Sequence, residues 1–281
     1  MFLLSYYMRR MMMIKLVISD MDGTFLNSAG DFNRPFYKEV KQLMDQQGVQ
    51  FAACTGKQCE RVEAIFGEET NDIWILGDSA TRIKQKGEYV YESLLANEIG
   101  LALIKKIETV APNVVIIACT ANGAMVKKDI TEDAIAIVRG SYHEVGFVED
   151  YATITDDFVK ITVYDKNLNC FETVKELETF TDKAYIVASE AAWIDVSNYD
   201  VHKGTTVKKL QAMLDVTADE TMCFGDGLND IELMEECTYS FAMRNGFEAT
   251  KDVARFVTGT NDEEAVLHTI QEILALQTPS K

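Results

Sequence analysis

The chain has 281 residues, of which 47% are hydrophobic and 26% charged, and its formal net charge is −18. This composition is typical of a globular protein with one large domain or two smaller ones. The acidic balance argues against nucleic acid and anionic membrane surfaces as partners. The three histidines lack the spacing of a zinc site, and six cysteines without a C-x-x-C pair indicate free buried thiols in a reducing compartment.

The first 13 residues do not fit a targeting or membrane segment. Their apolar run is too short to span a bilayer, and their two arginines follow the apolar residues, whereas a signal peptide begins with positive charge. We interpret residues 1–13 as a tail or as the product of an upstream translation start. The sequence therefore predicts a cytoplasmic protein.

The first part of the chain predicts alternating strands and helices. The apolar run 14–19 and the run 49–54 are typical of buried strands, and a third strand is expected at 73–76. Asn33 and Pro35 are suited to begin a helix between the first two strands, and a second helix is expected from Cys59 to Phe66. This order favours a parallel sheet with right-handed crossovers.

The pattern changes after about residue 85, where a hairpin-like stretch runs to about Tyr91. The apolar members of the segment from Leu94 to Ile107 lie at helical spacing. Strands with clearer alternation follow, which suggests a sheet with one open face. The elements expected here are strands at 114–119, 158–164 and 184–188 and a helix at 168–180.

The first pattern returns near residue 193 with a short strand at 193–196 and an amphipathic helix at 203–214. A buried strand at 222–224 then runs into Gly-Asp-Gly-Leu-Asn-Asp, and further helices and strands continue to about residue 276. The sequence thus predicts an α/β protein. Its tail is 1–13, its core domain combines 14–89 with 192–281, and 90–191 form an inserted α+β domain.

Aspartates follow two of the predicted buried strands. They are Asp20 and Asp22 after the first strand, and Asp226 and Asp230 after the strand at 222–224. Because the carboxyl ends of parallel strands share one edge, these aspartates are expected to converge, and their mutual repulsion calls for a hard cation such as Mg²⁺. Each aspartate alone is also explained as a turn former or helix cap.

The spacing of Asp20 and Asp22 suits phosphoryl transfer. Asp20 ends the strand and can attack a phosphorus atom as a nucleophile. Asp22 can protonate the leaving oxygen and then deprotonate the water that cleaves the acyl phosphate. Gly23 allows a tight turn, and Thr24 can cap the segment that follows.

Two further segments are suited to phosphate. Lys203 begins a predicted helix, where it opposes the helix dipole, and it is our candidate to screen the negative charge; on its own it is also explained as a solvated lysine. Thr55 and Gly56 precede a helix, where a hydroxyl and free N–H groups bind a phosphate oxygen well, and Lys57 adds charge.

Taken together, these motifs resemble the haloacid dehalogenase (HAD) superfamily, and within it the Cof-type phosphatases of subclass IIB with a large C2 cap. Asp20-Met-Asp-Gly-Thr24 is similar to the first motif, and Thr55-Gly56 to the second. Lys203-Gly204 is similar to the third and Gly225-Asp-Gly-Leu-Asn-Asp230 to the fourth, while Phe241–Gly246 is similar to the stretch after it. The resemblance spans about residues 14–270, with the four motifs in order.

The resemblance implies a Rossmann-like, doubly wound core and an inserted α/β cap at 90–191. It implies that Asp20, the carbonyl of Asp22, and Asp226 bind Mg²⁺, that Asp230 orders a ligand or water of the metal, and that Asn229 and Lys203 contact the phosphate or substrate. Two positions depart from the family pattern. Lys57 replaces the usual arginine, and Asp78-Ser79 replaces the usual Asn-Gly.

The sequence therefore predicts a Mg²⁺-dependent phosphatase that hydrolyses a small phosphorylated metabolite, such as a sugar phosphate, through an aspartyl-phosphate on Asp20. Two alternatives stay open. One is a phosphotransferase or phosphomutase of the same superfamily, and the other is a non-catalytic ligand-binding protein on this fold.

Overall fold

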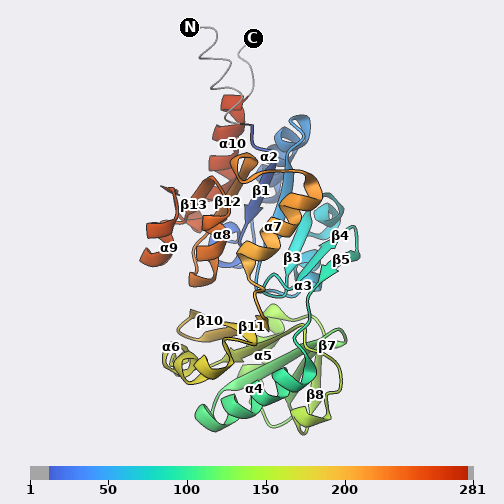
Figure 1. Cartoon of the computed structure of the whole chain (residues 1–281). Coiled ribbons are helices and arrows are strands. Elements are labelled where there is room, and N and C mark those ends of the chain that lie inside the picture. The colour runs from blue at the N-terminus through green and yellow to red at the C-terminus, as the bar shows by residue number, and fades with distance from the viewer. Residues whose placement is uncertain (1–12, 278–281) are drawn as a thin grey trace. The chain divides into compact units, whose positions relative to one another are not determined.

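The computed structural model describes residues 13–277, so the predicted tail lies outside the described residues except for Met13. The chain forms two compact units (Figure 1). Among the described residues, the first contains 13–54, 72–74 and 207–277. The second contains residues 55–71 and 75–206.

The first unit is built on parallel strands that are mostly buried. Strand β1 (Leu16–Ser19) lies between β12 and β2, with Ser19 opposite Phe224 on one side and Ala53 on the other. Apolar residues on both strand faces explain this burial, since parallel strands are usually covered on both sides. The order is β14 (Phe256–Val257), β13 (Tyr239–Ala242), β12 (Thr221–Gly225), β1 and β2 (Gln50–Cys54).

The helices of this unit begin and end where local residues favour it. Helix α2 (Arg34–Gln46) begins after Asn33, whose side chain accepts a hydrogen bond from the Phe36 N–H at 3.1 Å, and Pro35 lies in its first turn, so the predicted helix start is confirmed. The remaining helices here are α8 (Ile231–Glu235), α9 (Glu248–Val253) and α10 (Ala265–Gln277), and α10 packs against α2.

The second unit contains a six-stranded sheet whose pairs are antiparallel except for β7 with β8. Its apolar core includes Leu103, Ile107, Ile116 and Ile161. Gly100 lies so close to Phe158 that a Cβ would be 2.2 Å from the ring. The order is β10 (Ala184–Glu190), β11 (Trp193–Asn198), β9 (Lys160–Tyr164), β6 (Val115–Thr120), β7 (Gly123–Lys127) and β8 (Val145–Val148).

Helices α4 (Asn97–Val110), α5 (Glu132–Ser141) and the one-turn α6 (Cys170–Thr173) belong to the same unit. It also contains α3 (Cys59–Phe66), most of β3 (Trp74–Gly77) and a hairpin of β4 (Arg82–Gln85) with β5 (Glu88–Glu92). Helix α7 (Lys203–Leu214) begins in the second unit and continues into the first.

The predicted α/β class is confirmed, but two element assignments are wrong. The strand expected at 193–196 does not return to the parallel pattern, because β11 pairs antiparallel with β9 and β10 in the second sheet. A short connection to β10 permits only antiparallel pairing, whereas a parallel neighbour needs a long crossover. The helix expected at 168–180 is only α6 followed by a 3₁₀ segment, Val174–Phe180.

Among the described residues, no helix is both long enough and apolar enough to cross a membrane.

Candidate active site

The carboxyl ends of β1 and β12 bring three carboxylates together in the first unit. Asp20 follows β1, and its N–H donates to the carbonyl of Phe224 at 3.0 Å, which extends the parallel register beyond the strand. Asp226 follows β12, and Asp230 lies one short turn later. One carboxylate oxygen of each lies within 4.8 Å of the others. We call Asp20, Asp226 and Asp230 the acidic cluster.

The loop after β12 is folded around the side chain of Asp230, which is fully buried. Its Oδ2 accepts hydrogen bonds from the N–H groups of Asp226, at 3.0 Å, and Gly227, at 2.9 Å. Gly225 allows this carboxylate to approach, since a Cβ there would be 2.5 Å from the Asp230 Cγ. Asp230 therefore fixes the backbone that carries Asp226.

Gly225→Ala is expected to lower stability by about 1–3 kcal/mol, because the new methyl group would displace the buried Asp230 carboxylate. Gly140→Ala is the matched control, since no atom lies within 4 Å of a Cβ at that helical position and alanine favours a helix. Thermal unfolding of both variants checks this. Equal stability of Gly225→Ala and the wild-type protein would contradict the steric account.

The loop after β1 is tied to the same carboxylates. Thr24 Oγ1 donates to Asp226 Oδ1 at 2.6 Å. Gly23, with φ of 70°, leaves no space for a side chain, because a Cβ would be 2.4 Å from Asp226 Oδ2. Asp22, which lies between Asp20 and Gly23 in the sequence, is exposed. The loop thus fixes Asp226 while leaving Asp22 accessible to solvent.

Asn245 and Gly246 support the loops that carry the acidic cluster, although no sequence pattern predicts an individual role for them. Asn245 Nδ2 donates to the Gly23 carbonyl at 2.8 Å, so it connects the loop after β13 to the loop after β1. Gly246 lies against the backbone of Asp226, where a Cβ would be 2.9 Å from the carbonyl oxygen. The only signal in the sequence is the family-like stretch Phe241–Gly246.

The acidic cluster has the chemistry of a site for a hard divalent cation. Asp20 and Asp230 are buried and Asp226 is half-buried. Three carboxylates this close repel one another in a poorly hydrated site, and a cation with oxygen ligands relieves that repulsion. The donor set, oxygen without nitrogen or sulfur, suits Mg²⁺ better than zinc.

Of the remaining predicted site residues, Thr55, Gly56 and Lys203 belong to the second unit and Asn229 to the first. Thr55 is buried and directly follows β2, and its Oγ1 accepts a hydrogen bond from the Lys57 N–H at 3.1 Å. Lys203 is the first residue of α7 and is only 3% exposed, so the alternative of a solvated lysine is wrong. Asn229, in the first unit, is half-buried in the 3₁₀ turn Leu228–Asp230.

Asp78 and Ser79 lie in an unusual turn after β3. Asp78, Ser79 and Ala80 all have positive φ angles, of 55°, 59° and 63°, which non-glycine residues adopt at a cost of about 1–2 kcal/mol each. Asp78 is buried, and its Oδ2 has no hydrogen-bond partner among residues 13–277. Burial raises the pKa of this carboxyl, and the charges of Lys160 and Arg82 only partly oppose that effect.

Comparison with known proteins identifies the family. Residues 17–270 match the haloacid dehalogenase-like hydrolases. This chain belongs to that family. A 5-amino-6-(5-phospho-D-ribitylamino)uracil phosphatase of Escherichia coli (strain K12), YbjI, is 29% identical to this HAD-like hydrolase over 269 residues, which cover 95% of this chain and 99% of the relative.

Solved structures agree on the fold. The crystal structure of SMU.1108c from Streptococcus mutans UA159 has a TM-score of 0.89 and 25% identity, with coverage of 93% of this chain and 99% of the other. The HAD subclass IIB sugar phosphatase BT4131 has a TM-score of 0.80 and 19% identity, with coverage of 92% and 98%. The predicted family, the Rossmann-like fold and the assignment as a phosphoric monoester hydrolase of this family are confirmed.

Proposed function

We propose that this HAD-like hydrolase is a Mg²⁺-dependent phosphatase that hydrolyses a small phosphorylated metabolite, a sugar phosphate or similar phosphomonoester, through an aspartyl-phosphate on Asp20. The observation that carries the proposal is the acidic cluster, in which Asp20 lies beside two further carboxylates at the end of a parallel sheet. A nucleophilic carboxylate next to a cation site is the arrangement that aspartyl-phosphate chemistry needs.

The reaction has two steps. In the first, an oxygen of Asp20 attacks the phosphorus, the bond from phosphorus to the ester oxygen breaks, and Asp22 gives its proton to the leaving alcohol. In the second, Asp22 takes a proton from water, the water oxygen attacks the phosphorus, and the acyl phosphate bond breaks to restore the Asp20 carboxylate. The solvent exposure of Asp22 supports its exchange of protons with substrate and water.

The phosphoryl group is proposed to bind to Thr55, Gly56, Lys203 and Asn229. The buried Lys203 ammonium supplies positive charge, and Lys57 adds a further one. Asp20, the carbonyl of Asp22, Asp226 and Asp230 would hold Mg²⁺ directly or through water. When bound, Mg²⁺ neutralises charge on the phosphoryl oxygens and lets two anions approach each other.

We propose, further, that 14–89 and 192–281 act as the core domain and that 90–191 act as an inserted C2-type cap that selects the substrate. A cytoplasmic location is also proposed, and the six free, buried cysteines support a reducing compartment. The partner is a small phosphorylated molecule rather than nucleic acid or a membrane, in keeping with the net charge of −18.

The substrate test uses a panel of phosphorylated metabolites and an aryl phosphate, each with Mg²⁺ and with EDTA. The panel includes 5-amino-6-(5-phospho-D-ribitylamino)uracil, the compound in the name of the E. coli relative. Mg²⁺-dependent release of inorganic phosphate without any acceptor sugar is expected. Release only when an acceptor is added would indicate a phosphotransferase or mutase, and ligand binding without turnover would indicate a non-catalytic protein.

A further inference from the structure

We propose that Lys160 is a positioning residue, which acts through the backbone of Thr55–Lys57 to orient the Thr55 hydroxyl toward a bound phosphoryl group. This inference rests on the proposed function, which assigns Thr55 to the phosphate. Lys160 lies on β9, more than 100 residues away in the sequence, yet its Nζ donates to the Gly56 carbonyl at 2.6 Å. Both residues belong to the second unit.

Lys160 is held in place by a buried network. Its side chain is 2% exposed, and its Nζ also donates to Ser79 Oγ at 3.1 Å and lies 3.5 Å from Asp195 Oδ1. The three acceptors match the three N–H donors of an ammonium group. Ser79 Oγ in turn donates to Asp195 Oδ1 at 2.9 Å. The strained turn at Ser79 therefore serves to connect Lys160 and Asp195.

The ammonium group stays charged despite its burial. Burial by itself lowers the pKa of Lys160, but the acidic groups around it, among them Tyr142 and Asp195, raise the pKa overall. Thr162 Oγ1 donates to Asp195 Oδ1 at 3.1 Å and further fixes the carboxylate. The Lys160 ammonium group thus lies against the carbonyl of Gly56.

The contact with Gly56 reaches Thr55 through one peptide group. The carbonyl of that peptide binds Lys160, and its N–H, which belongs to Lys57, donates to Thr55 Oγ1. Because the peptide is planar, fixing the carbonyl also fixes the N–H, and polarising one end strengthens the other. Thr55 Oγ1 accepts this hydrogen bond through a lone pair, and we infer that its hydroxyl hydrogen is then donated to a phosphoryl oxygen.

The carbonyl groups of the two neighbouring residues, Thr55 and Lys57, also accept hydrogen bonds within the protein. The carbonyl of Thr55 accepts from the Ser79 N–H at 3.1 Å, and the carbonyl of Lys57 accepts from the Asp78 N–H at 2.7 Å. With Lys160 on Gly56, every carbonyl oxygen of Thr55–Lys57 has a donor. Carbonyl oxygens repel a bound anion, so an anion site requires that they point away from it. Of the three groups that donate to these carbonyls, only Lys160 is charged.

The test measures the dissociation constant of inorganic phosphate for the full-length, Mg²⁺-loaded protein by calorimetry. The probe is the neutral pair Lys160→Met with Asp195→Asn, which removes both charges of the ion pair together. We expect about fivefold weaker phosphate binding, the effect of one hydrogen bond. Thr55→Val is expected to weaken binding similarly, and adding the neutral pair to Thr55→Val is expected to cause no further loss, because Lys160 acts through Thr55.

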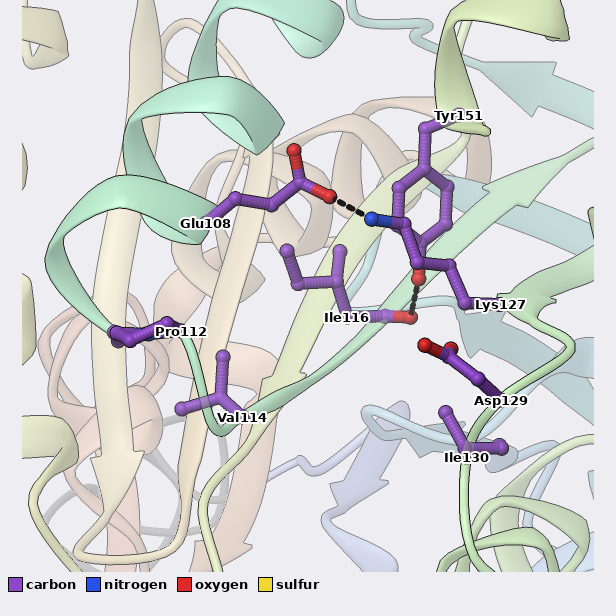
Figure 2. Close-up of a pocket in the computed structure, with 9 residues that line it drawn as sticks. Glu108, Pro112, Val114, Ile116, Lys127, Asp129, Ile130 and Tyr151 are labelled. Carbon is purple, nitrogen blue, oxygen red and sulfur yellow. Dashed lines mark hydrogen bonds and ion pairs between the residues drawn. The ribbon is translucent and has the colours of Figure 1, made fainter. Parts of the chain in front are cut away.

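A second ion pair in the same unit, more exposed than that of Lys160 and Asp195, gives the control. Figure 2 shows Lys127 directed toward Glu108 beside a pocket of about 260 Å³. Lys127 Nζ lies 5.5 Å from the Tyr151 ring centroid, much as Lys160 Nζ lies 5.3 Å from that of Tyr142. None of the proposed phosphate-binding residues lines this pocket. Lys127→Met with Glu108→Gln should leave phosphate binding unchanged.

Two results would overturn the proposal. One is unchanged phosphate binding in the neutral pair, and the other is a combined variant in which the losses of affinity from the neutral pair and from Thr55→Val multiply. If the neutral pair fails to fold, Ser79→Ala, which keeps both charges, replaces it in the same cycle. The binding readout needs no turnover. A wild-type protein that binds phosphate but hydrolyses nothing would therefore refute the proposed function while the cycle still decides the role of Lys160.

Discussion

Asp20→Asn is expected to lower the rate of phosphate release by about 10³-fold or more while the protein stays folded. The amide has the shape of the carboxylate but cannot attack phosphorus effectively. Residue 20 is buried at the end of β1, and its backbone N–H donates to the Phe224 carbonyl. Neither feature depends on the negative charge of the side chain. Removal of one of three clustered carboxylates also reduces repulsion.

The measurement compares initial rates at saturating Mg²⁺ and substrate, together with thermal unfolding. Asp31→Asn is the matched control, because Asp31 is exposed in the same connection and pairs with Arg34 instead of the acidic cluster. The control is expected to keep wild-type activity. Activity of Asp20→Asn within about tenfold of wild type would exclude Asp20 as the nucleophile, since loss of a nucleophile costs far more.

The second large effect concerns Asp226 and the cation. Asp226→Asn is expected to weaken Mg²⁺ binding by about 10- to 100-fold or more. Loss of a residue that only hydrogen-bonds to a metal ligand already has an effect of that size. The variant keeps an oxygen that can accept from Thr24 Oγ1, so the loop after β1 retains its contact. Without metal, the variant is expected to be as stable as the wild-type protein or more so, because a like charge is removed.

Metal-induced stabilisation checks this prediction independently of activity. Mg²⁺ at about 100 times the wild-type dissociation constant stabilises the wild-type protein by about 2.7 kcal/mol, whereas tenfold weaker binding at the same concentration leaves about 1.4 kcal/mol. The Mg²⁺-induced rise in melting temperature is therefore expected to fall by half or more in Asp226→Asn. Asp219→Asn is the control, since Asp219 accepts from Thr238 Oγ1 outside the cluster. A full Mg²⁺ shift in Asp226→Asn would show that the cation binds elsewhere.

The sequence predicts the strand-end residues well because their signal is local. An apolar run that ends in Asp20, and another that ends shortly before Asp226, specify buried strands with polar loops, and parallel pairing then brings the two aspartates together. The order of the motifs predicted the family, and the match over residues 17–270 confirms this prediction.

Contacts between distant segments could not be predicted in this way. The bond from Asn245 to the Gly23 carbonyl depends on how two loops are folded, and no periodicity reports it. Lys160 shows the problem most clearly. A lysine in an alternating strand is normally assigned to the solvent face, whereas here Asp195 on a neighbouring strand compensates its charge and allows burial.

The measurement that tests the central claim most directly is the trapping of the phosphorylated enzyme. Excess enzyme is mixed with labelled phosphomonoester and Mg²⁺, quenched in acid within a single turnover, and digested for peptide mass spectrometry. The account predicts phosphate on the peptide that contains Asp20, stable in acid and lost in base, and none in Asp20→Asn. Phosphate release by the wild-type enzyme with no label on that peptide at any quench time would contradict it.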